Sequence, residues 1–370
     1  VPNLRFPEFQ GEWITYKIKD VLSIGNGRDY KHLNNGGIPV FGTGGYMTSV
    51  DECLYDGETT FIGRKGSINK PFYYNGKFWT VDTLFYTHSF NGITPKFTYC
   101  LFQTINWLKY NEASGVPSLS KDTIEKIKIN IPKLEEQNKI AKLMFALDER
   151  IATQNKIIDK LQSLIKGIND TLYAQHGDEV MTSFAELGTS YSGLSGKSAQ
   201  DFGSGKPFIT YLNVYSNNVI NENEFQYVAI KDGEKQNIVE YGDVLFTLSS
   251  ETPNEVGIGS VFLGKEKVYL NSFCFGIHIT NKEVAFPPFL SYYVSSTAFR
   301  KFIYPFAQGS TRFNLCKADF EKASIKLPTL ENQKRIYSIL SHIDSKIETE
   351  KHMLDLYNSQ KQYLLRQMFI

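Results

Sequence analysis

Cysteines, histidines and long apolar runs are all scarce in this sequence. Its 370 residues include four cysteines and six histidines, and the cysteines stand far apart without CxxC spacing. This pattern favours reduced thiols over a disulfide framework or a zinc site. No apolar run approaches the ~20 residues of a membrane-spanning helix, and the first residues lack a signal-peptide pattern. We therefore expect a cytoplasmic protein.

A large excess of positive charge is also missing. The net charge of +1 argues against a protein that coats nucleic acid by itself. Acids are unevenly distributed, however: between Glu58 and Glu112 the only acid is Asp82, and between Glu283 and Asp319 there is none. Basic residues lie among aromatic residues in both stretches, a pattern that suits a phosphate backbone and base edges. A solvated surface with its aromatic side chains in a core is the alternative for each stretch.

Catalytic signatures are absent as well. Gly193 to Ser198 comes close to a P-loop, but Tyr191 stands where that motif needs glycine. Phe286-Pro-Pro-Phe289 lacks the polar first residue of the amino-methyltransferase motif, and neither a Glu-x-Lys nuclease signature nor GxSxG occurs. The sequence gives no positive reason to expect an enzyme, and we predict no catalytic residue, bound cofactor or metal on this chain.

A long-range repeat is the main positive feature. Ile131-Pro-Lys-Leu-Glu-Glu-Gln137 returns 196 residues later as Leu327-Pro-Thr-Leu-Glu-Asn-Gln333. A period this long is far from that of a solenoid or propeller repeat, so each copy must be a whole domain with its own helix. The chain is therefore predicted to be a tandem duplication.

Apolar residues at heptad spacing follow each copy of the repeat. The first seam is Ile140, Met144, Leu147, Ile151, Gln154, Ile158, Leu161, Ile165, Ile168 and Leu172, and the second is Ile336, Leu340, Ile343, Ile347, Glu350, Leu354, Tyr357, Lys361, Leu364 and Met368. Polar Gln154 and Glu350 occupy equivalent core positions, where such residues can set register. We expect the two helices to pair as an antiparallel coiled coil about a pseudo-two-fold axis. A coil that dimerises with another chain is the alternative.

The segments before each helix are rich in short strands. Gly37–Phe41, Thr59–Ile62 and Thr80–Tyr86 read as strands, and helices are expected over 96–108 and 291–302. The predicted fold class is α+β. We predict strand-rich domains at 1–132 and 176–328 and long helices at 133–175 and 329–370.

Two Gly/Ser-containing loops, Ser114–Ser120 and Gln308–Leu315, precede the two copies of the repeat. With the paired domains and helices, they make the chain resemble the specificity subunit of a type I restriction–modification system. The resemblance implies that each strand-rich domain is a target-recognition domain that reads one half of a bipartite double-stranded DNA sequence, while the helices fix the spacer. A coiled-coil protein-interaction adaptor and a solitary DNA-modifying enzyme are the other function classes.

The resemblance also implies partners. Two methylation subunits would use S-adenosylmethionine to methylate adenines, and restriction (motor) subunits would use ATP and Mg²⁺ to cleave DNA. The chain itself would be a non-catalytic specificity subunit, and the assembled complex would be a site-specific deoxyribonuclease and adenine methyltransferase.

Base reading needs side chains with fixed donors and acceptors on well-held loops. In the first domain the predicted DNA-binding residues are Arg28, Lys31, Tyr46, Arg64, Lys65, Ser67, Ser114, Gly115, Ser118 and Ser120. In the second domain they are Lys197, Lys206, Tyr211, Ser249, Ser250, Ser310, Thr311, Arg312 and Asn314.

Overall fold

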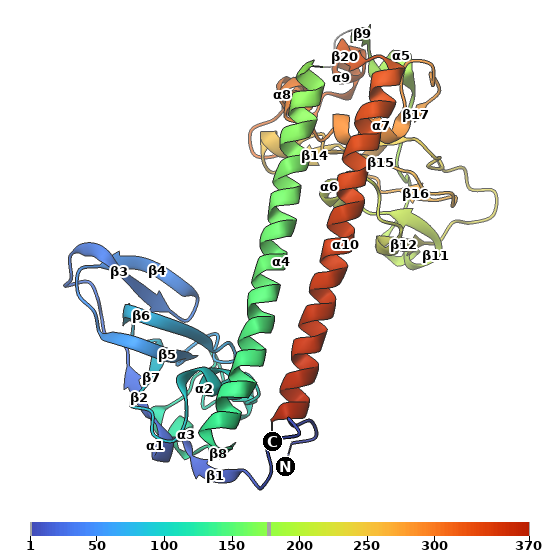
Figure 1. Ribbon diagram of the computed structural model, residues 1–370. Helices are drawn as coiled ribbons and strands as arrows, with labels where there is room; N and C mark the ends of the chain where they lie inside the picture. Colours follow the sequence, from blue (N-terminus) through green and yellow to red (C-terminus); the bar gives the residue numbers. More distant parts are fainter. Residues whose placement is uncertain (1, 176–178, 370) are drawn as a thin grey trace. The chain divides into compact units, whose positions relative to one another are not determined.

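The computed structural model describes residues 2–175 and 179–369, and the chain separates into two compact units. Unit 1 takes the residues up to Lys156 and those from Lys351 onward, and unit 2 runs from Ile157 to Glu350. Both boundaries cut through long helices, α4 (Leu134–Gln175) and α10 (Leu330–Met368), which Figure 1 shows in green and red. Each unit therefore holds one strand-rich domain with a part of both helices. The division into four separate domains stays a prediction.

Unit 1 is built around one sheet with the strand order β2-β7-β5-β6-β3-β4. Neighbouring strands are antiparallel except β3 and β6, which are parallel. The outlying pair β1 and β8 joins the start of the domain to the residues before α4. The strands are β1 (Ile14–Lys17), β2 (Ser23–Asn26), β3 (Asn35–Gly42), β4 (Gly45–Val50), β5 (Tyr55–Gly63), β6 (Phe72–Thr80), β7 (Leu84–His88) and β8 (Lys128–Ile131).

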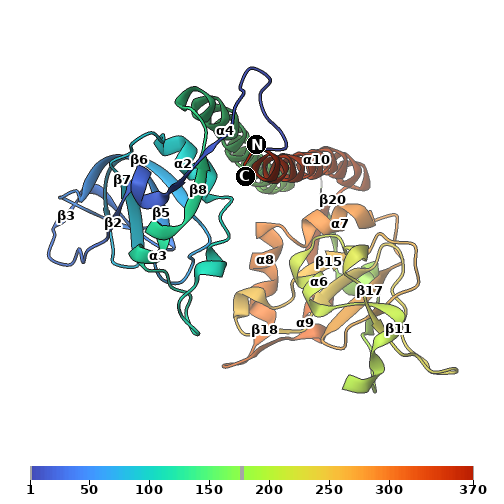
Figure 2. The same ribbon diagram turned by 90° about the horizontal axis from the view of Figure 1, so that it is seen from below.

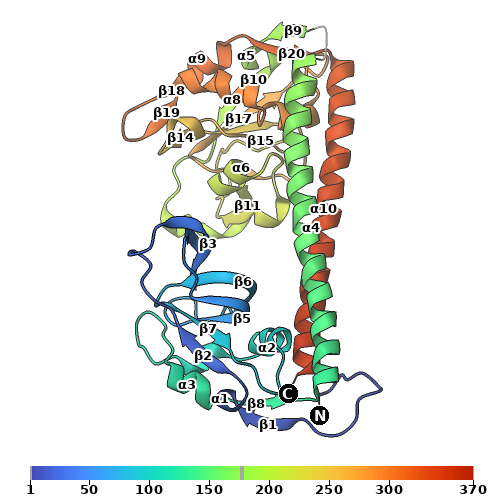
Figure 3. The ribbon, with the colours of Figure 1, turned by 60° about the vertical axis from the view of Figure 1, so that its left-hand side comes forward.

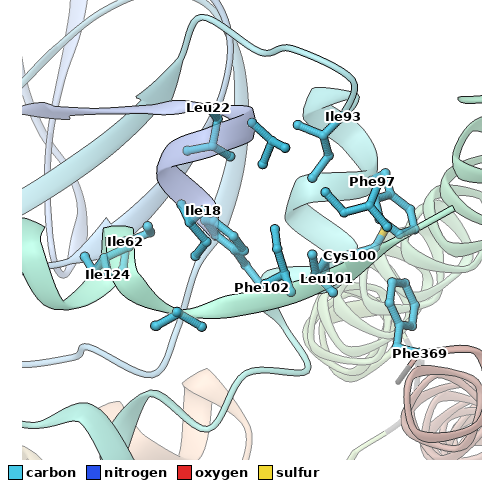
Figure 4. Packing of buried hydrophobic residues seen from close by; sticks show 14 of the residues in the cluster. Ile18, Leu22, Ile62, Ile93, Phe97, Cys100, Leu101, Phe102, Ile124 and Phe369 are labelled. Carbon is cyan, nitrogen blue, oxygen red and sulfur yellow. The ribbon is translucent and has the colours of Figure 1, made fainter. Parts of the chain in front are cut away.

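Short helices close the core of unit 1. They are α1 (Ile18–Val21), α2 (Pro95–Phe102), α3 (Lys121–Lys126) and a 3-10 turn at Trp107–Tyr110. Phe97 and Cys100 of α2 lie in one apolar cluster with Leu365 and Met368 from the end of α10 and with Phe369, which follows that helix. The rings of Phe97 and Phe369 stack with their centroids 5.5 Å apart. Figure 4 shows both side chains in the cluster. The amide N–H of Leu4 donates to the carbonyl of Gln367 at 2.9 Å, so this core needs segments from both ends of the described chain.

Two expectations for unit 1 were wrong in detail. The helix predicted over 96–108 ends at Phe102, and Trp107 rather than Leu108 is buried, because a 3-10 turn changes the face that points inward. The strand predicted over 80–86 is interrupted: β6 ends at Thr80, and the chain turns before β7 begins at Leu84. This turn, 81–83, lies at the centre of the site described below.

Unit 2 distributes its strands over several small sheets. Their orders are β10-β17-β13-β15, β12-β11-β16, β14-β19-β18 and β20-β9. The strands are β9 (Glu179–Thr182), β10 (Gly188–Ser192), β11 (Phe202–Ile209), β12 (Gln226–Val228), β13 (Val244–Thr247), β14 (Ser249–Ser250), β15 (Gly259–Val261), β16 (Tyr269–Leu270), β17 (Cys274–Ile279), β18 (Ala307–Gln308), β19 (Phe313–Leu315) and β20 (Ile325–Pro328). The helices besides α4 and α10 are α5 (Phe184–Leu187), α6 (Tyr211–Ser216), α7 (Pro287–Tyr293), α8 (Thr297–Ile303) and α9 (Lys317–Lys322).

The helix expected over 291–302 is two helices in the structure. Helix α7 starts earlier, with Pro287 and Pro288 in its first turn, where proline loses no helical hydrogen bond. Ser296 then caps a new helix, α8, because its hydroxyl accepts from the amide N–H of Phe299 at 3.1 Å. Figure 2 shows α7 between α10 and the strands of unit 2, and residues of α7 share an apolar cluster with Ile336 and Leu340 of α10.

The heptad prediction for the long helices is confirmed. None of the predicted seam residues is fully exposed, and Gln154 is buried. In unit 1 the helices run antiparallel, since Asp148 forms an ion pair with Lys361 and the Arg150 guanidinium lies 5.5 Å from the Tyr357 ring. In unit 2, Ile168 and Leu172 of α4 pack with the first turns of α10.

The repeated glutamines explain why the sequence motif recurs. The Gln137 amide donates to the carbonyls of Gly92 and Pro132, each at 2.9 Å, and its oxygen accepts from the Thr94 amide. Gln333 makes the same three bonds in unit 2: its amide donates to the carbonyls of Val284 and Pro328, and its oxygen accepts from the amide of Phe286. Both glutamines are fully buried. Each therefore fixes the start of a long helix to the loop before α2 or α7.

Candidate nucleic-acid interface

Loops of unit 1 converge on the turn at 81–83. The amide N–H of Arg28 donates to the carbonyl of Thr80 at 2.7 Å, and that of Arg64 donates to the carbonyl of Thr83 at 2.8 Å. The amide of Val81 donates to Phe41 at 3.0 Å, next to the β3–β4 hairpin. The turn therefore holds the β2–β3, β3–β4 and β5–β6 connections beside one another. Figure 3 shows the sheet that carries these connections.

The loop that precedes the first long helix joins this group. The amide of Leu119 donates to the carbonyl of Arg64 and the amide of Gly66 to that of Pro117, each at 2.9 Å, while Lys65 and Ser118 form a β-bridge. Most of the sequence-predicted residues of this domain thus lie on loops that are tied together by main-chain bonds. We call this group of loops, made of residues 27–31, 42–47, 64–67, 81–83 and 111–120, the unit 1 loop cluster.

The side chains of the unit 1 loop cluster differ in availability. Arg28, Lys31, Lys65, Ser67, Ser114 and Gly115 are exposed. Tyr46 is 64% exposed, with its hydroxyl 3.0 Å from that of Ser49. Arg64 is half-buried: its guanidinium donates to the carbonyl of Asp82 at 3.2 Å and lies 5.8 Å from the Phe85 ring. These contacts orient Arg64 without neutralising it.

Ser118, through its main chain, and Ser120, through its hydroxyl, hold the loop within the domain. Ser118 donates its amide to Asn111 at 2.9 Å. Ser120 caps α3, accepting from the amide of Thr123 at 3.2 Å, and its hydroxyl donates to Glu112 at 2.7 Å. Hydrogen bonds from Thr123 and Ser120 lower the pKa of Glu112. Ser120 therefore positions the loop, and its hydroxyl is not free for a base.

In unit 2 the predicted residues gather at a cleft of about 340 Å³. The short strand β14 pairs with β19, placing Ser249 opposite Asn314, and the amide of Leu315 donates to Leu248 at 2.8 Å. This bond repeats the one between Leu119 and Arg64 in unit 1. The cleft, which we call the unit 2 cleft, is lined by Tyr211, Leu212, Tyr215, Ser249, Ser250, Glu251, Glu255, Phe273 and Arg312.

Several polar groups of the unit 2 cleft bind one another. The Tyr211 hydroxyl donates to the carbonyl of Ser249 at 2.8 Å, and the Tyr215 hydroxyl donates to Glu255 at 2.7 Å. Ser250 also donates to Glu255, at 3.1 Å, and the bonds that Glu255 receives lower its pKa. The two tyrosine rings stack with centroids 6.0 Å apart. The wall of the cleft is thus rigid.

Some predicted residues of unit 2 lie outside the cleft. The ammonium of Lys197 is 2.6 Å from a carboxylate oxygen of Glu234 and donates to the carbonyl of Ala229 at 2.6 Å, and its side chain is 6% exposed. Its geometry is that of an internal ion pair rather than a reader of DNA. Lys206 is exposed on β11, in a different sheet from β14. Ser310, Thr311 and Asn314 are exposed on the β18–β19 hairpin next to Arg312.

Sequence reasoning missed five of the residues that line the cleft: Leu212, Tyr215, Glu251, Glu255 and Phe273. Leu212 and Phe273 are 68% and 56% exposed, and Glu251 is an exposed acid beside them. An apolar residue directly after the predicted reader Tyr211, and an acid directly after Ser250, were the available signals. Neither signal points to DNA by itself, because an apolar residue is usually part of a core and a carboxylate is repelled by phosphates.

The sequence was compared with models of known protein families. The model described as the type I restriction modification DNA specificity domain matches residues 10–163 and again residues 192–356. The chain belongs to this family. The two matches fall on the two strand-rich domains with the adjoining helices, so the duplication read from the sequence is a duplication of the specificity domain.

Curated relatives of this specificity-domain protein are specificity subunits. The MjaX specificity subunit of Methanocaldococcus jannaschii is 28% identical over 294 residues, which cover 70% of this chain and 64% of the relative. The MjaVIII specificity subunit of the same organism is 25% identical over 321 residues, covering 80% of this chain and 73% of the relative. The chain therefore spans about two thirds of the length of these relatives.

Solved structures show that the fold is shared. The S subunit of a type I restriction–modification system from M. genitalium has a TM-score of 0.62 at 14% identity, covering 100% of this chain and 99% of that one. A chain from a structural study of type I R-M complex assembly and conformational transition has a TM-score of 0.60 at 15% identity, covering 97% of both chains.

Two features are absent from the parts of the specificity-domain protein that the structure describes. In the parts of the chain that the structure describes, no group of three or more His, Cys, Asp or Glu could hold a metal ion. No helix among those residues is long and apolar enough to cross a membrane.

Proposed function

We propose that this chain selects the DNA sequence on which a type I restriction–modification complex acts. The observation that carries the proposal is the repetition of one scaffold with different loops. In each unit a loop before the long helix is bonded to the turn after a central strand, through Leu119 and Arg64 or through Leu315 and Leu248. Rigid loops with variable side chains are what base readout requires. Each unit would read one half of a bipartite target.

Within unit 1 the proposed readers are the available side chains of the loop cluster: Arg28, Lys31, Tyr46, Arg64, Lys65, Ser67 and Ser114. In unit 2 they are the side chains around the cleft and on the adjacent hairpin: Tyr211, Ser310, Thr311, Arg312 and Asn314. Arginine is the usual partner of guanine, and tyrosine and serine are among the residues that contact phosphates.

The long helices would set the unread spacer between the half-sites. Helix α4 has 42 residues and α10 has 39, and at ~1.5 Å per residue each extends roughly 60 Å. Inserting one heptad into both helices at matched positions preserves the apolar seam. The expected result is a longer spacer with both half-sites unchanged. Retained methylation with the original spacer would refute the spacer role.

Catalysis would come from partners. We propose that two methylation subunits, which bind S-adenosylmethionine, and restriction subunits, which use ATP and Mg²⁺, assemble on this chain in the cytoplasm. The family membership and the relatives, which are specificity subunits of type I restriction enzymes, support this arrangement. The chain itself would supply specificity to both reactions. Its net charge of +1 fits a division of labour in which partners provide much of the contact with phosphates.

The decisive experiment is to co-express the chain with a matching methylation subunit and to map methylated adenines across the host genome. One split motif that disappears without this chain would establish the function and give the target. A stable complex that methylates no motif would favour a protein-interaction adaptor, and methylation by the purified chain alone would favour a solitary modifying enzyme.

A further inference from the structure

The unit 2 cleft contains two opposite charges that do not bind each other. Arg312 and Glu251 both line the cleft, and neither forms a hydrogen bond or ion pair with any residue in 2–175 or 179–369. Burial raises the pKa of the Tyr211 phenol, and the Arg312 guanidinium is close enough to oppose that rise. The cleft therefore presents a free donor group and a free acceptor group to a ligand.

The remaining polar groups of the cleft are less available. Glu255 already accepts hydrogen bonds from Tyr215, Ser250 and Thr252, the last at 2.7 Å. A carboxylate with several donors has little capacity left for a base. This difference singles out Glu251 as the acid that can accept from a ligand.

Apolar side chains border the two charges. Phe273 is 56% exposed, yet its backbone is fixed: its amide donates to Asn271 and its carbonyl accepts from the amide of Leu248, each at 2.9 Å. Leu212, 68% exposed, follows Tyr211 in the first turn of α6, which Thr210 caps. Such side chains exclude water when a ligand enters, and hydrogen bonds made beside them become stronger.

We propose that the unit 2 cleft reads one guanine–cytosine pair through both of its bases, with Arg312 donating to guanine O6 and N7 and Glu251 accepting from the cytosine N4 amino group. In the major groove only guanine offers two adjacent acceptors to a guanidinium, because adenine places an amino donor beside N7. The cytosine amino group is the donor that a carboxylate recognises. The inference rests on the proposed function and specifies one base pair of the second half-site.

The test uses the chain assembled with its methylation subunits. The wild-type motif is mapped first, and Arg312→Ala and Glu251→Ala are then compared with it. Each variant should relax discrimination at the same G·C pair of one half-site by roughly ten- to hundredfold, with the other half-site unchanged. Lys265→Ala and Glu266→Ala are matched controls, since both residues are exposed in unit 2 and neither lines the cleft. Retained reading of the other base pairs in the same half-site shows that unit 2 of each variant is folded.

Synthetic duplexes sharpen the assignment. With 7-deazaguanine at the pair, the wild-type complex should bind more weakly, while Arg312→Ala should be indifferent to the loss of N7. N4-methylcytosine should likewise weaken the wild type and leave Glu251→Ala unaffected. Relaxation at an A·T pair, at two different pairs, or equally at all sequences would overturn the proposal. A wild-type complex without a split motif would instead overturn the proposed function.

Discussion

The two units share the same main-chain contacts, but the residues that make those contacts have different side chains. Arg64 and Leu248 occupy equivalent places, since each accepts a hydrogen bond from the residue that ends the loop before the long helix. Unit 1 has its cation there and exposes Val116 on the facing loop, whereas unit 2 has leucine there and places Arg312 on the facing loop. The cation therefore lies on the segment after a central strand in unit 1 and on the loop before the long helix in unit 2.

A second exchange occurs in the core sheets. In unit 1 Gly25 of β2 faces Tyr86 of β7, and a Cβ at Gly25 would lie 2.1 Å from the ring. In unit 2 the tyrosine is on the first strand and the glycine on the second: Tyr191 of β10 faces Gly276 of β17, with a corresponding distance of 2.2 Å. In each of these strand pairs a tyrosine ring lies over a glycine that leaves room for it. Either strand can carry the tyrosine.

The largest expected difference between the units concerns Arg5. It forms a bidentate ion pair, with two distances of 2.7 Å, to Glu136, whose side chain is 2% exposed. Arg5→Met should destabilise unit 1 by ~3–5 kcal/mol, because it leaves a buried carboxylate without its partner. Denaturant unfolding monitored by hydrogen exchange would measure the free energy of unfolding of each unit separately.

The equivalent of Glu136 in unit 2 is Asn332, which carries no charge. Adding Glu136→Asn to Arg5→Met should therefore recover part of the lost stability. A double variant as unstable as Arg5→Met would show that the loss comes from packing of the arginine and not from the stranded carboxylate.

The buried glutamines should behave alike. Gln137→Leu and Gln333→Leu each remove three hydrogen bonds and leave backbone groups without partners, so each should cost ~2–4 kcal/mol in its own unit. Exposed Asn138→Leu and Lys334→Leu are the neighbouring controls. Hydrogen exchange that increases equally in both units for either variant would contradict the independence of the two cores.

Arg64 provides a smaller and more local test of the comparison. If it reads guanine, Arg64→Ala should cost ~1–3 kcal/mol and relax specificity in the half-site that Arg312→Ala leaves intact. The motif would be mapped by methylation, with Lys128→Ala, an exposed lysine on β8, as the control. Equal weakening at every sequence would identify a phosphate contact instead.

The smallest expected effect is on acid stability. Hydrogen bonding to Lys197 contributes most to lowering the pKa of Glu234 to about 2. A carboxyl group with a lowered pKa stabilises the fold above its unfolded value of ~4.3, and this contribution disappears as the pH falls toward 2. Lys197→Met should flatten that part of the pH dependence of unfolding in unit 2 alone. An unchanged pH profile would mean that the ion pair does not hold in solution.

The sequence predicted the duplication and the helical seams because both depend on spacing. Residues such as Ile140 and Ile336 repeat at heptad intervals, and burial follows the interval. The turn at 81–83 was missed because Val81 and Thr83 have high strand propensity, and tertiary contacts overrode it.

The site was harder to predict than the fold. Arg312 and Arg64 were named because they are basic residues in segments poor in acids, and the structure places both on well-held loops. Lys197 has the same local sequence character, but it pairs with Glu234, 37 residues away. Spacing cannot reveal such a partner. Glu251 and Phe273 become candidates only because they line the cleft, and segments that are far apart in the sequence form that cleft.

The bond from Leu4 to Gln367 has a consequence for the order in which the protein folds during synthesis. Unit 2 is one continuous stretch, whereas the core of unit 1 lacks Leu365, Met368 and Phe369 until the ribosome has made residues beyond 350. Of these two units, the one whose translation starts earlier is therefore completed later. A nascent chain would carry an unfinished apolar surface around Phe97 until residues 365–369 have been made.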